Sequence, residues 1–337
     1  MKEAMLYTRR DGGVVECHLC HQRCVIQPGR RGICLVRENR DGTLYSLVYR
    51  RLIARHVDPI EKKPLFHFHP GTLSYSIATV GCNFRCTFCQ NCTISQLPHD
   101  ENRIEGVDVA PEDIVAEAVR RNCASISYTY TEPTIFIEYA YDIMRLARLQ
   151  GLKNVWVSNG YLTPEGLDVV APYLDAINID LKSFDSRTYR RLAAARLEPI
   201  LETLPLYRPK NIWLEITTLV IPGINDSEDE LRRIAQFIAG SLGADVPWHV
   251  SRFHPDYRML DHGATPPETL RRAVALGHEA GLQYVYSGNL PGDPNEHTYC
   301  PSCGQMLIER YGLTVRTYRI ERCACSFCGQ AIAGVGL

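Results

Sequence analysis

The chain has 337 residues, of which 45% are hydrophobic and 22% are charged, and its formal net charge is -1. This composition is typical of a globular protein with one large core and small appendages. A charge so close to zero argues against a broad basic surface, so we expect neither nucleic acid nor a membrane as a partner. No run of about 18 apolar residues is present, and the first residues lack an apolar stretch of signal-peptide length. We therefore expect a cytoplasmic protein.

Thirteen of the fourteen cysteines fall into three groups, and the remaining one lies between the second and third groups. In a reducing compartment, so many cysteines indicate metal binding or redox chemistry rather than disulfides. Three groups separated by long cysteine-poor stretches predict a central domain with a metal-bound module at each end. The predicted domains are an N-terminal cysteine-rich module and extension at 1–71, a core domain at 72–290 and a C-terminal module at 291–337.

Short apolar or β-branched runs alternate with helical patterns in the central part of the chain. The expected strands are 76–80, 125–130, 154–158, 176–181, 212–220, 248–253 and 283–288. The expected helices are 111–121, 134–149, 164–173, 186–194, 227–239 and 267–280. This alternation predicts an α/β fold with a parallel sheet, open or closed into a barrel, and an active site at the carboxyl ends of its strands.

The segment that precedes the first of these strands has a weaker pattern. "TLYSLVYRRLIARHV" predicts one or two strands, and "DPIEKKPLFHFHPG" predicts a loop interrupted by prolines. His67 and His69 in this loop are either ligands or substrate contacts, or they are solvated side chains. We favour the solvated loop.

Polar and thiol side chains follow five of the expected strands. The residues are Cys82, Cys86 and Cys89 after the first strand, Glu132 after the second, Ser158 and Asn159 at the end of the third, Asp180 and Lys182 at the end of the fourth, and His254 after the sixth. Each of them alone is typical of a loop residue or a helix cap. Because five strand ends carry such residues, the pattern predicts a shared site.

The spacing Cys82-x3-Cys86-x2-Cys89 is unusual for zinc, which prefers two close pairs of ligands. Short runs of cysteines hold iron–sulfur clusters. Three ligands on a four-iron cluster leave one iron open to a substrate or cofactor. Cys92 offers a fourth thiolate, but the first three cysteines already form a complete pattern. We therefore predict a [4Fe-4S] cluster with one open iron.

Cys82-x3-Cys86-x-Phe88-Cys89 also resembles the signature of the radical S-adenosylmethionine (SAM) superfamily. "SYTYTEPTIF", "VWVSNGYLTPEGL", "INIDLKSF", "LEITTLVIPGINDSEDEL" and "WHVSRFHPDYRM" resemble the AmmeMemoRadiSam system radical SAM enzymes, a group similar to pyruvate formate-lyase activating enzyme. The resemblance extends from about Cys17 to the C-terminus. It implies a partial (β/α)6 radical SAM barrel.

The resemblance implies that Cys82, Cys86 and Cys89 bind the [4Fe-4S] cluster and that SAM binds its open iron. Reductive cleavage of SAM then yields a 5'-deoxyadenosyl radical, which abstracts hydrogen from an unidentified substrate, either a small molecule or a protein glycine. Tyr130 and Thr131 replace two glycines of the activating enzymes. The implied cofactor contacts are Thr131, Glu132 with the methionyl ammonium, Ser158, Asn159, Asp180, Lys182 and His254.

The resemblance also implies partners for such an enzyme. One is a low-potential electron donor such as flavodoxin or ferredoxin. The others are a Memo-like protein and an AMMECR-domain protein.

The C-terminal group predicts a zinc ribbon. "CPSCG" and "CSFCG" are two Cys-x2-Cys-Gly knuckles, and the segment between them predicts a hairpin with a glycine turn. Zn2+ is the commoner occupant of such a site, and rubredoxin-like iron is the alternative. Four thiolates leave no open position, so the expected role is structural. The predicted ligands are Cys300, Cys303, Cys325 and Cys328, with Cys323 left over.

The N-terminal group, Cys17-x2-Cys20-x3-Cys24-x9-Cys34, is able to enclose zinc or to hold an auxiliary cluster. We favour zinc or another closed structural site, flanked by His18 and His21. Cys123 is expected to be a small buried apolar residue.

A second class of function is also consistent with three groups of cysteines. A non-catalytic iron–sulfur or zinc-ribbon protein would carry electrons or bind nucleic acid or protein, but this alternative leaves the polar residues at the strand ends unexplained. Four arginines give the ribbon a basic character, and we interpret them as a solvated face. They are Arg310, Arg316, Arg319 and Arg322.

Overall fold

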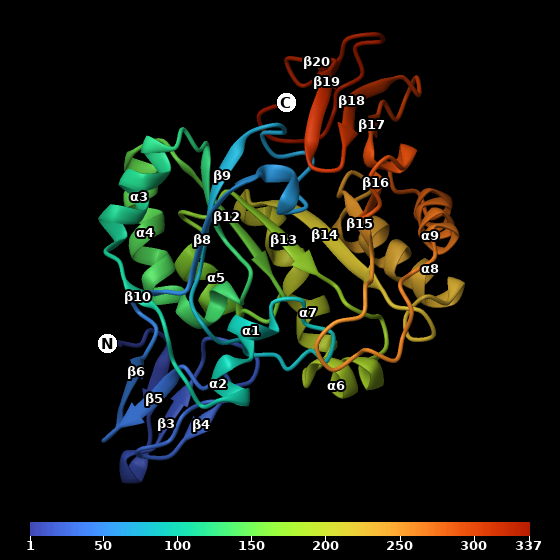
Figure 1. The fold of residues 1–337 in the computed structure, drawn as a ribbon. Helices are drawn as coiled ribbons and strands as arrows, with labels where there is room; N and C mark the ends of the chain where they lie inside the picture. The colour runs from blue at the N-terminus through green and yellow to red at the C-terminus, as the bar shows by residue number, and fades with distance from the viewer.

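The computed structural model describes residues 1–337, and its centre is an eight-stranded sheet (Figure 1). Seven strands are parallel and lie side by side in chain order. They are β9 (Leu73–Ala78), β11 (Ser125–Tyr128), β12 (Lys153–Ser158), β13 (Ala176–Asp180), β14 (Trp213–Val220), β15 (Trp248–Arg252) and β16 (Val285–Gly288). The eighth strand, β8 (Ala54–Pro59), pairs antiparallel with β9. Because β8 and β16 form the two edges and do not pair, the sheet stays open.

Helices connect the successive parallel strands. They are α1 (Cys92–Ser95), α2 (Leu97–Asp100), α3 (Pro111–Arg120), α4 (Ile137–Leu149), α5 (Pro164–Val170), α6 (Ser186–Ala193), α7 (Glu198–Thr203), α8 (Glu228–Phe237) and α9 (Pro267–Glu279). Six strand–helix units followed by β16 confirm the expected partial (β/α)6 arrangement. The sequence did not predict α7, whose Pro199 occupies the first turn, where a helix tolerates proline.

Side-chain caps explain where three of these helices begin. The Thr163 hydroxyl accepts a hydrogen bond from the Gly166 amide before α5, at 3.2 Å. Asp185 caps α6 in the same way through the Thr188 amide at 2.7 Å. Ser227 caps α8. Such caps satisfy amides that have no partner inside the helix, so the start of each helix is encoded locally.

The N-terminal region forms small sheets of its own before the chain enters the central sheet. Its strands are β1 (Lys2–Glu3), β2 (Tyr7–Arg9), β3 (Val15–Cys17), β4 (Val25–Ile26), β5 (Arg37–Arg40) and β6 (Thr43–Ser46), and β7 (Arg51–Leu52) pairs with β10 (Val107–Asp108). The segment 43–57, which predicted one or two strands, therefore contributes to three. Because β8 belongs to the central sheet, residues 54–59 are part of the core rather than of the N-terminal module.

The C-terminal region is a small group of antiparallel strands beside the central sheet (Figure 1). Its strands are β17 (Thr298–Tyr299), β18 (Met306–Tyr311), β19 (Thr314–Tyr318), β20 (Ile320–Glu321) and β21 (Ala324–Cys325). The expected hairpin is present as β18–β19, and Gly312 in its two-residue turn has a φ of 59°. A positive φ at this position favours glycine.

Residues 60–71 close the amino end of the central sheet, and we call this segment the plug. Ile60, Leu65 and Phe68 are buried against Val155 in β12 and Ala176 in β13. His67 is 1% exposed. The prediction of a solvated loop at His67 is therefore wrong, because the plug fills the space between the strands at this end.

His67 is held by partners that are distant in the sequence. Its Nδ1 lies 2.6 Å from the Ala333 carbonyl oxygen, and its Nε2 lies 2.5 Å from the Tyr286 hydroxyl. A neutral ring satisfies both contacts when Nδ1–H donates to the carbonyl and Nε2 accepts from the hydroxyl. The environment of His67 therefore favours its uncharged form.

The C-terminal strands pack onto the plug through Arg310, which is 1% exposed. Its guanidinium donates to the Phe66 carbonyl oxygen at 2.9 Å and to the Thr298 hydroxyl at 2.7 Å, and it lies 4.2 Å from the centre of the Phe66 ring. Arg310 is thus not part of a solvated face, and that part of the prediction is wrong. Arg316, Arg319 and Arg322 are exposed, as expected.

Burial of His67 makes the stability of the protein depend on pH. Burial lowers the pKa of this ring from 6.5 to about 4. Between these two values the unfolded chain takes up a proton that the folded chain does not, so stability is lost as the pH falls. We expect the unfolding free energy to fall by about 2 kcal/mol from pH 7 to pH 5 through this group.

Calorimetric melting curves at a series of pH values test this prediction. The decrease should be smaller in a His67→Gln variant and unchanged in His262→Gln, whose ring is 31% exposed. An equally steep decrease in His67→Gln and in the parent protein would show that other groups control the pH dependence.

Candidate functional site

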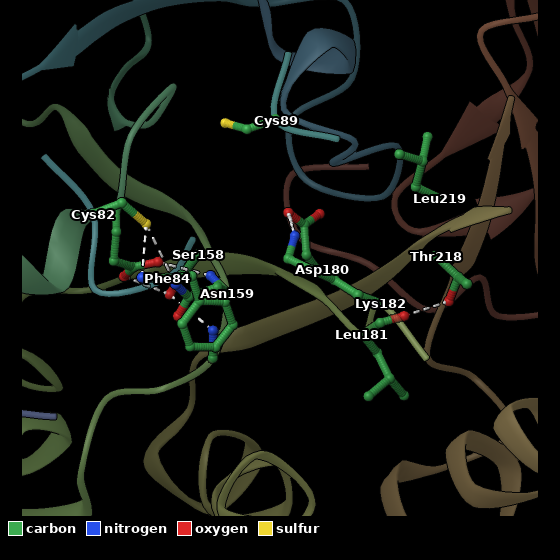
Figure 2. Close-up of polar contacts among 12 residues, drawn as sticks. Cys82, Phe84, Cys89, Ser158, Asn159, Asp180, Leu181, Lys182, Thr218 and Leu219 are labelled. Atoms are coloured by element: carbon green, nitrogen blue, oxygen red, sulfur yellow. Dashed lines mark hydrogen bonds and ion pairs between the residues drawn. The ribbon is translucent and has the colours of Figure 1, made fainter. Parts of the chain in front are cut away.

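The three thiols of the expected cluster lie in the loop that follows β9. Cys82 Sγ accepts a hydrogen bond from the Phe84 amide at 3.4 Å, and Cys89 Sγ lies 3.1 Å from the Ser95 hydroxyl. Figure 2 shows Cys82 beside Ser158 and Asn159, with Cys89 at a separate position. The three sulfurs do not form a group within 4.8 Å of one another. They are therefore not grouped as the ligands of a single metal ion would be.

Burial makes two of these thiols, Cys82 and Cys86, poor acids without a metal. It raises the pKa of Cys82 well above its usual value, with a smaller contribution from Glu132. It also raises the pKa of Cys86 to about 12. Thiols bind metals as thiolates, so a bound metal has to stabilise negative charge at this place.

Glu132 links the ends of β11 and β12 by hydrogen bonds, and its side chain is buried. One carboxylate oxygen accepts from the Thr134 amide at 3.0 Å, the Thr134 hydroxyl at 2.6 Å and the Ser158 hydroxyl at 2.9 Å. The other accepts from the Asn159 amide at 2.8 Å. The sequence assigned this carboxylate to a ligand ammonium, whereas in the structure four donors of the chain itself already occupy it.

Asn159 connects β12 to the cysteine loop. Its side-chain amide donates to Asn83 Oδ1 at 2.7 Å and lies 3.9 Å from Cys82 Sγ. Asn83 is 1% exposed. The sequence did not single out Asn83, although its position directly after Cys82 was a signal that it would lie at the site.

Tyr130 adopts a backbone conformation that favours glycine. Its φ is 63°, in the left-handed region, which costs a non-glycine residue about 1–2 kcal/mol. The Tyr130 hydroxyl donates to Asp58, and the Lys63 ammonium lies 4.7 Å from the centre of the ring. These contacts hold the side chain, so a tyrosine takes the place expected for a glycine. Thr131 donates from its hydroxyl to the Thr79 carbonyl oxygen at 2.8 Å.

Asp180 and Lys182 form an ion pair at the carboxyl end of β13, at 2.8 Å (Figure 2). The Lys182 side chain is 15% exposed and that of Asp180 is 37% exposed. Although burial opposes it, Asp180 and then Cys86 raise the pKa of Lys182. The ammonium therefore stays charged and contributes positive charge next to the expected cluster ligands.

The loop after β15 covers the cysteine loop. The Arg258 amide donates to the Thr87 carbonyl oxygen at 2.9 Å, and the Arg258 guanidinium donates to Asp100 of α2 at 2.7 Å. Tyr257 also donates to Asp100. His254 lies in the same loop but is exposed. The structure thus joins Cys82, Glu132, Ser158 and Asn159 by hydrogen bonds, whereas Asp180 and Lys182 form a separate pair and His254 bonds to neither group.

The four expected ribbon thiols converge on one point. Cys300 Sγ lies 3.6 Å from Cys328 Sγ, and Cys303 Sγ lies 3.8 Å from Cys325 Sγ. All four sulfurs lie within 4.8 Å of one another. A tetrahedral zinc site with Zn–S bonds of about 2.3 Å places its sulfurs about 3.8 Å apart. The geometry therefore suits a single metal ion, and Cys323 lies outside the group, as predicted.

Two further expectations concern residues away from the site. Cys123 is 5% exposed and lies in the main apolar core, as predicted. None of the helices has the length and apolar character that crossing a membrane requires.

Comparisons with known proteins agree with this geometry. The family model of the radical SAM superfamily matches residues 76–238. A protein of Methanocaldococcus jannaschii described as uncharacterized is 47% identical over 334 residues, which cover 98% of this chain and 99% of that protein. Pyruvate formate-lyase 1-activating enzyme of Escherichia coli (strain K12) is 21% identical, with 61% of this chain and 89% of that protein covered.

Two further proteins are similar to this chain, one in sequence and one in structure. A putative glycyl-radical enzyme activating enzyme of Methanocaldococcus jannaschii is 26% identical, with 53% of this chain and 66% of that protein covered. The crystal structure of Streptococcus suis SuiB bound to S-adenosylmethionine has a TM-score of 0.51 and 14% identity, with 68% of this chain and 53% of that chain covered. At this identity the structural likeness supports the fold alone.

Proposed function

Because the chain belongs to the radical SAM superfamily, we propose that Cys82, Cys86 and Cys89 hold a [4Fe-4S] cluster at which the enzyme cleaves SAM reductively. When bound, the cluster supplies the electron for this cleavage, and the resulting 5'-deoxyadenosyl radical abstracts hydrogen from the substrate. The observation that carries the proposal is the placement of three thiols, one buried and two partly buried, in the loop after β9, beside Asn159 and Lys182. The alternative of a non-catalytic metalloprotein is not favoured by this family.

The residues around the thiols have separate roles in this proposal. Lys182 offsets the negative charge of the thiolates, because its ammonium is charged and acts on Cys86. Asn159 orients Cys82 and Asn83. Asp180, the most exposed carboxylate of the site, offers an oxygen to a hydroxyl or ammonium of SAM.

Glu132 acts as a positioning residue in this proposal. Its carboxylate holds Ser158 and Asn159 in place. His254 and Thr131 remain proposed SAM contacts.

The substrate class follows from the relatives rather than from a bound molecule. Two of them are named as activating enzymes, which supports a protein glycine as the substrate, with a small molecule as the second candidate. We also propose that the enzyme belongs to the AmmeMemoRadiSam group, with Memo-like and AMMECR-domain proteins as partners and flavodoxin or ferredoxin as electron donor. The ribbon is proposed to hold Zn2+, as its compact thiols suggest.

Formation of 5'-deoxyadenosine tests the proposed chemistry. The anaerobically reconstituted protein, reduced with a low-potential reductant and mixed with SAM, is expected to release 5'-deoxyadenosine, whereas Cys86→Ala should release at least a hundredfold less. Cys123→Ala is the matched control, because Cys123 is also buried but belongs to none of the three cysteine groups. The proposal fails if a loaded and reduced parent protein yields no more product than Cys86→Ala.

A further inference from the structure

The four N-terminal cysteines line one small cavity. They come from the end of β3 and from the loops on either side of β4. Cys17 and Cys34 are buried, and Cys20 and Cys24 are partly buried. Folding thus brings four thiols that span 17–34 in the sequence around a shared space. Four thiols that face one cavity are a site for a metal or a metal cluster.

The separation of these thiols distinguishes between the two occupants that the sequence left open. The four ribbon thiols all lie within 4.8 Å of one another, whereas the four N-terminal thiols do not form such a compact group. A single zinc ion needs its four sulfurs at about 3.8 Å from one another. In a four-iron cluster each thiolate binds a different iron, so the sulfurs stand apart across the width of the cluster. The N-terminal thiols are therefore not grouped as the ligands of one zinc ion would be, which favours the cluster.

The polar groups that line the cavity also suit a cluster. Arg37 lines it and is 2% exposed; its guanidinium pairs with the buried Glu138 carboxylate, and its Nε atom has no hydrogen-bond partner. The sulfurs of a cluster accept hydrogen bonds from such N–H groups. The Asn83 side chain also lines the cavity, and its Nδ2 has no partner. Two buried N–H donors, one on Arg37 and one on Asn83, therefore lack acceptors at the wall of this cavity.

We propose that Cys17, Cys20, Cys24 and Cys34 hold a second [4Fe-4S] cluster, in place of the zinc that the sequence favoured. The assignment of this second site does not depend on the proposed central cluster. A cluster with four thiolates has no open iron, so it stores or passes an electron instead of binding a substrate.

The position of the cavity gives this second cluster a role. Asn83 lines the cavity and directly follows Cys82, and the Gln22 side chain from the cavity wall donates to the Asn83 carbonyl oxygen at 3.0 Å. Asn83 thus lies next to both cysteine sites. The second cluster would accept one electron from a reduced flavoprotein or iron–sulfur protein and pass it to the central cluster, returning to its oxidised state. This role, unlike the site itself, rests on the proposed function.

Iron, sulfide and zinc analysis tests the site. With one cluster at each place, the reconstituted parent protein should contain about eight irons per chain, and a variant with Cys82, Cys86 and Cys89 all changed to alanine should keep about four irons and as many sulfides. A Cys20→Ala/Cys24→Ala variant should lose that second set and keep the ribbon zinc, which also reports that the chain is folded. Cys323→Ala is the matched control, because Cys323 belongs to no group. Two zinc ions and no iron in the triple variant would overturn the second cluster.

Comparison of two reductants tests the role. With a flavodoxin-type protein donor, the Cys20→Ala/Cys24→Ala variant should form 5'-deoxyadenosine at least tenfold more slowly than the parent protein. With dithionite, a small reductant able to reach the central site directly, the loss should be much smaller. An equal loss with both reductants, or no loss with either, would overturn the electron-transfer role and leave the iron analysis unaffected.

Discussion

Glu132→Ala is expected to lower the unfolding free energy by about 4 kcal/mol, because two buried backbone amides each lose their acceptor at a cost of about 2 kcal/mol. These amides belong to Thr134 and Asn159, and the hydrogen bonds they donate to the carboxylate are buried. The two hydroxyl donors, on Thr134 and Ser158, are able to rotate toward other acceptors. Chemical denaturation of the metal-free protein measures the loss.

Glu132→Gln distinguishes the contributions of the two carboxylate oxygens to stability. A glutamine oxygen is able to replace the oxygen that takes three donors, but its NH2 group would then face the Asn159 amide, donor against donor. We expect about half the destabilisation of Glu132→Ala. We also expect at least a tenfold slower release of 5'-deoxyadenosine at full iron content, because Asn159 orients Cys82.

Thr134→Val is the matched control for both variants. It removes one hydroxyl donor and keeps the carboxylate and both amides in place, so its cost should be about 1 kcal/mol. If Glu132→Ala is no less stable than Thr134→Val, the carboxylate does not hold the strand ends together.

Glu215→Leu is expected to lower the unfolding free energy by about 5 kcal/mol, as removal of one member of a buried, hydrogen-bonded charge site does. The Glu215 carboxylate is 0% exposed. It accepts from the Phe66 amide at 3.0 Å and from the His67 amide at 2.8 Å, so it anchors the plug. It also accepts from Trp213 Nε1 at 2.9 Å and from His249 Nε2 at 2.7 Å. Although burial opposes it, His249 holds the pKa of Glu215 below its usual value, which keeps the acceptor ionised.

Loss of this anchor should release the plug before the rest of the sheet unfolds. Limited proteolysis is therefore expected to cleave Glu215→Leu within residues 60–71 under conditions in which the parent protein stays intact. Glu268→Gln serves as the control, because the Glu268 side chain is 78% exposed and its ion pair with Arg271 lies at the surface. Its stability should stay within about 0.5 kcal/mol of the parent protein. Equal resistance of Glu215→Leu and Glu268→Gln to the protease would contradict the anchoring role.

The sequence alone determined the regular part of the fold. The six strand–helix units and β16 were predicted within a few residues, because apolar periodicity, first-turn prolines and side-chain caps act between residues that are close in the chain. The spacing of Cys82, Cys86 and Cys89 and the polar residues at the strand ends also predicted the candidate site. Parallel strands bring their carboxyl ends to one edge, so their order in the chain was sufficient.

Only the tertiary structure decided which polar residues are buried and how far apart the thiols stand. His67 is enclosed by Glu215, Tyr286 and Ala333, which are far from it in the sequence, so its local pattern was that of an exposed loop. The Glu132 carboxylate accepts hydrogen bonds from Ser158 and Asn159, which lie at the end of the next strand. For the N-terminal cysteines, the sequence specified four thiols but not their separation. That separation depends on how β3, β4 and the neighbouring loops pack, because the choice between one ion and a cluster is a matter of distances in space rather than of spacing along the chain.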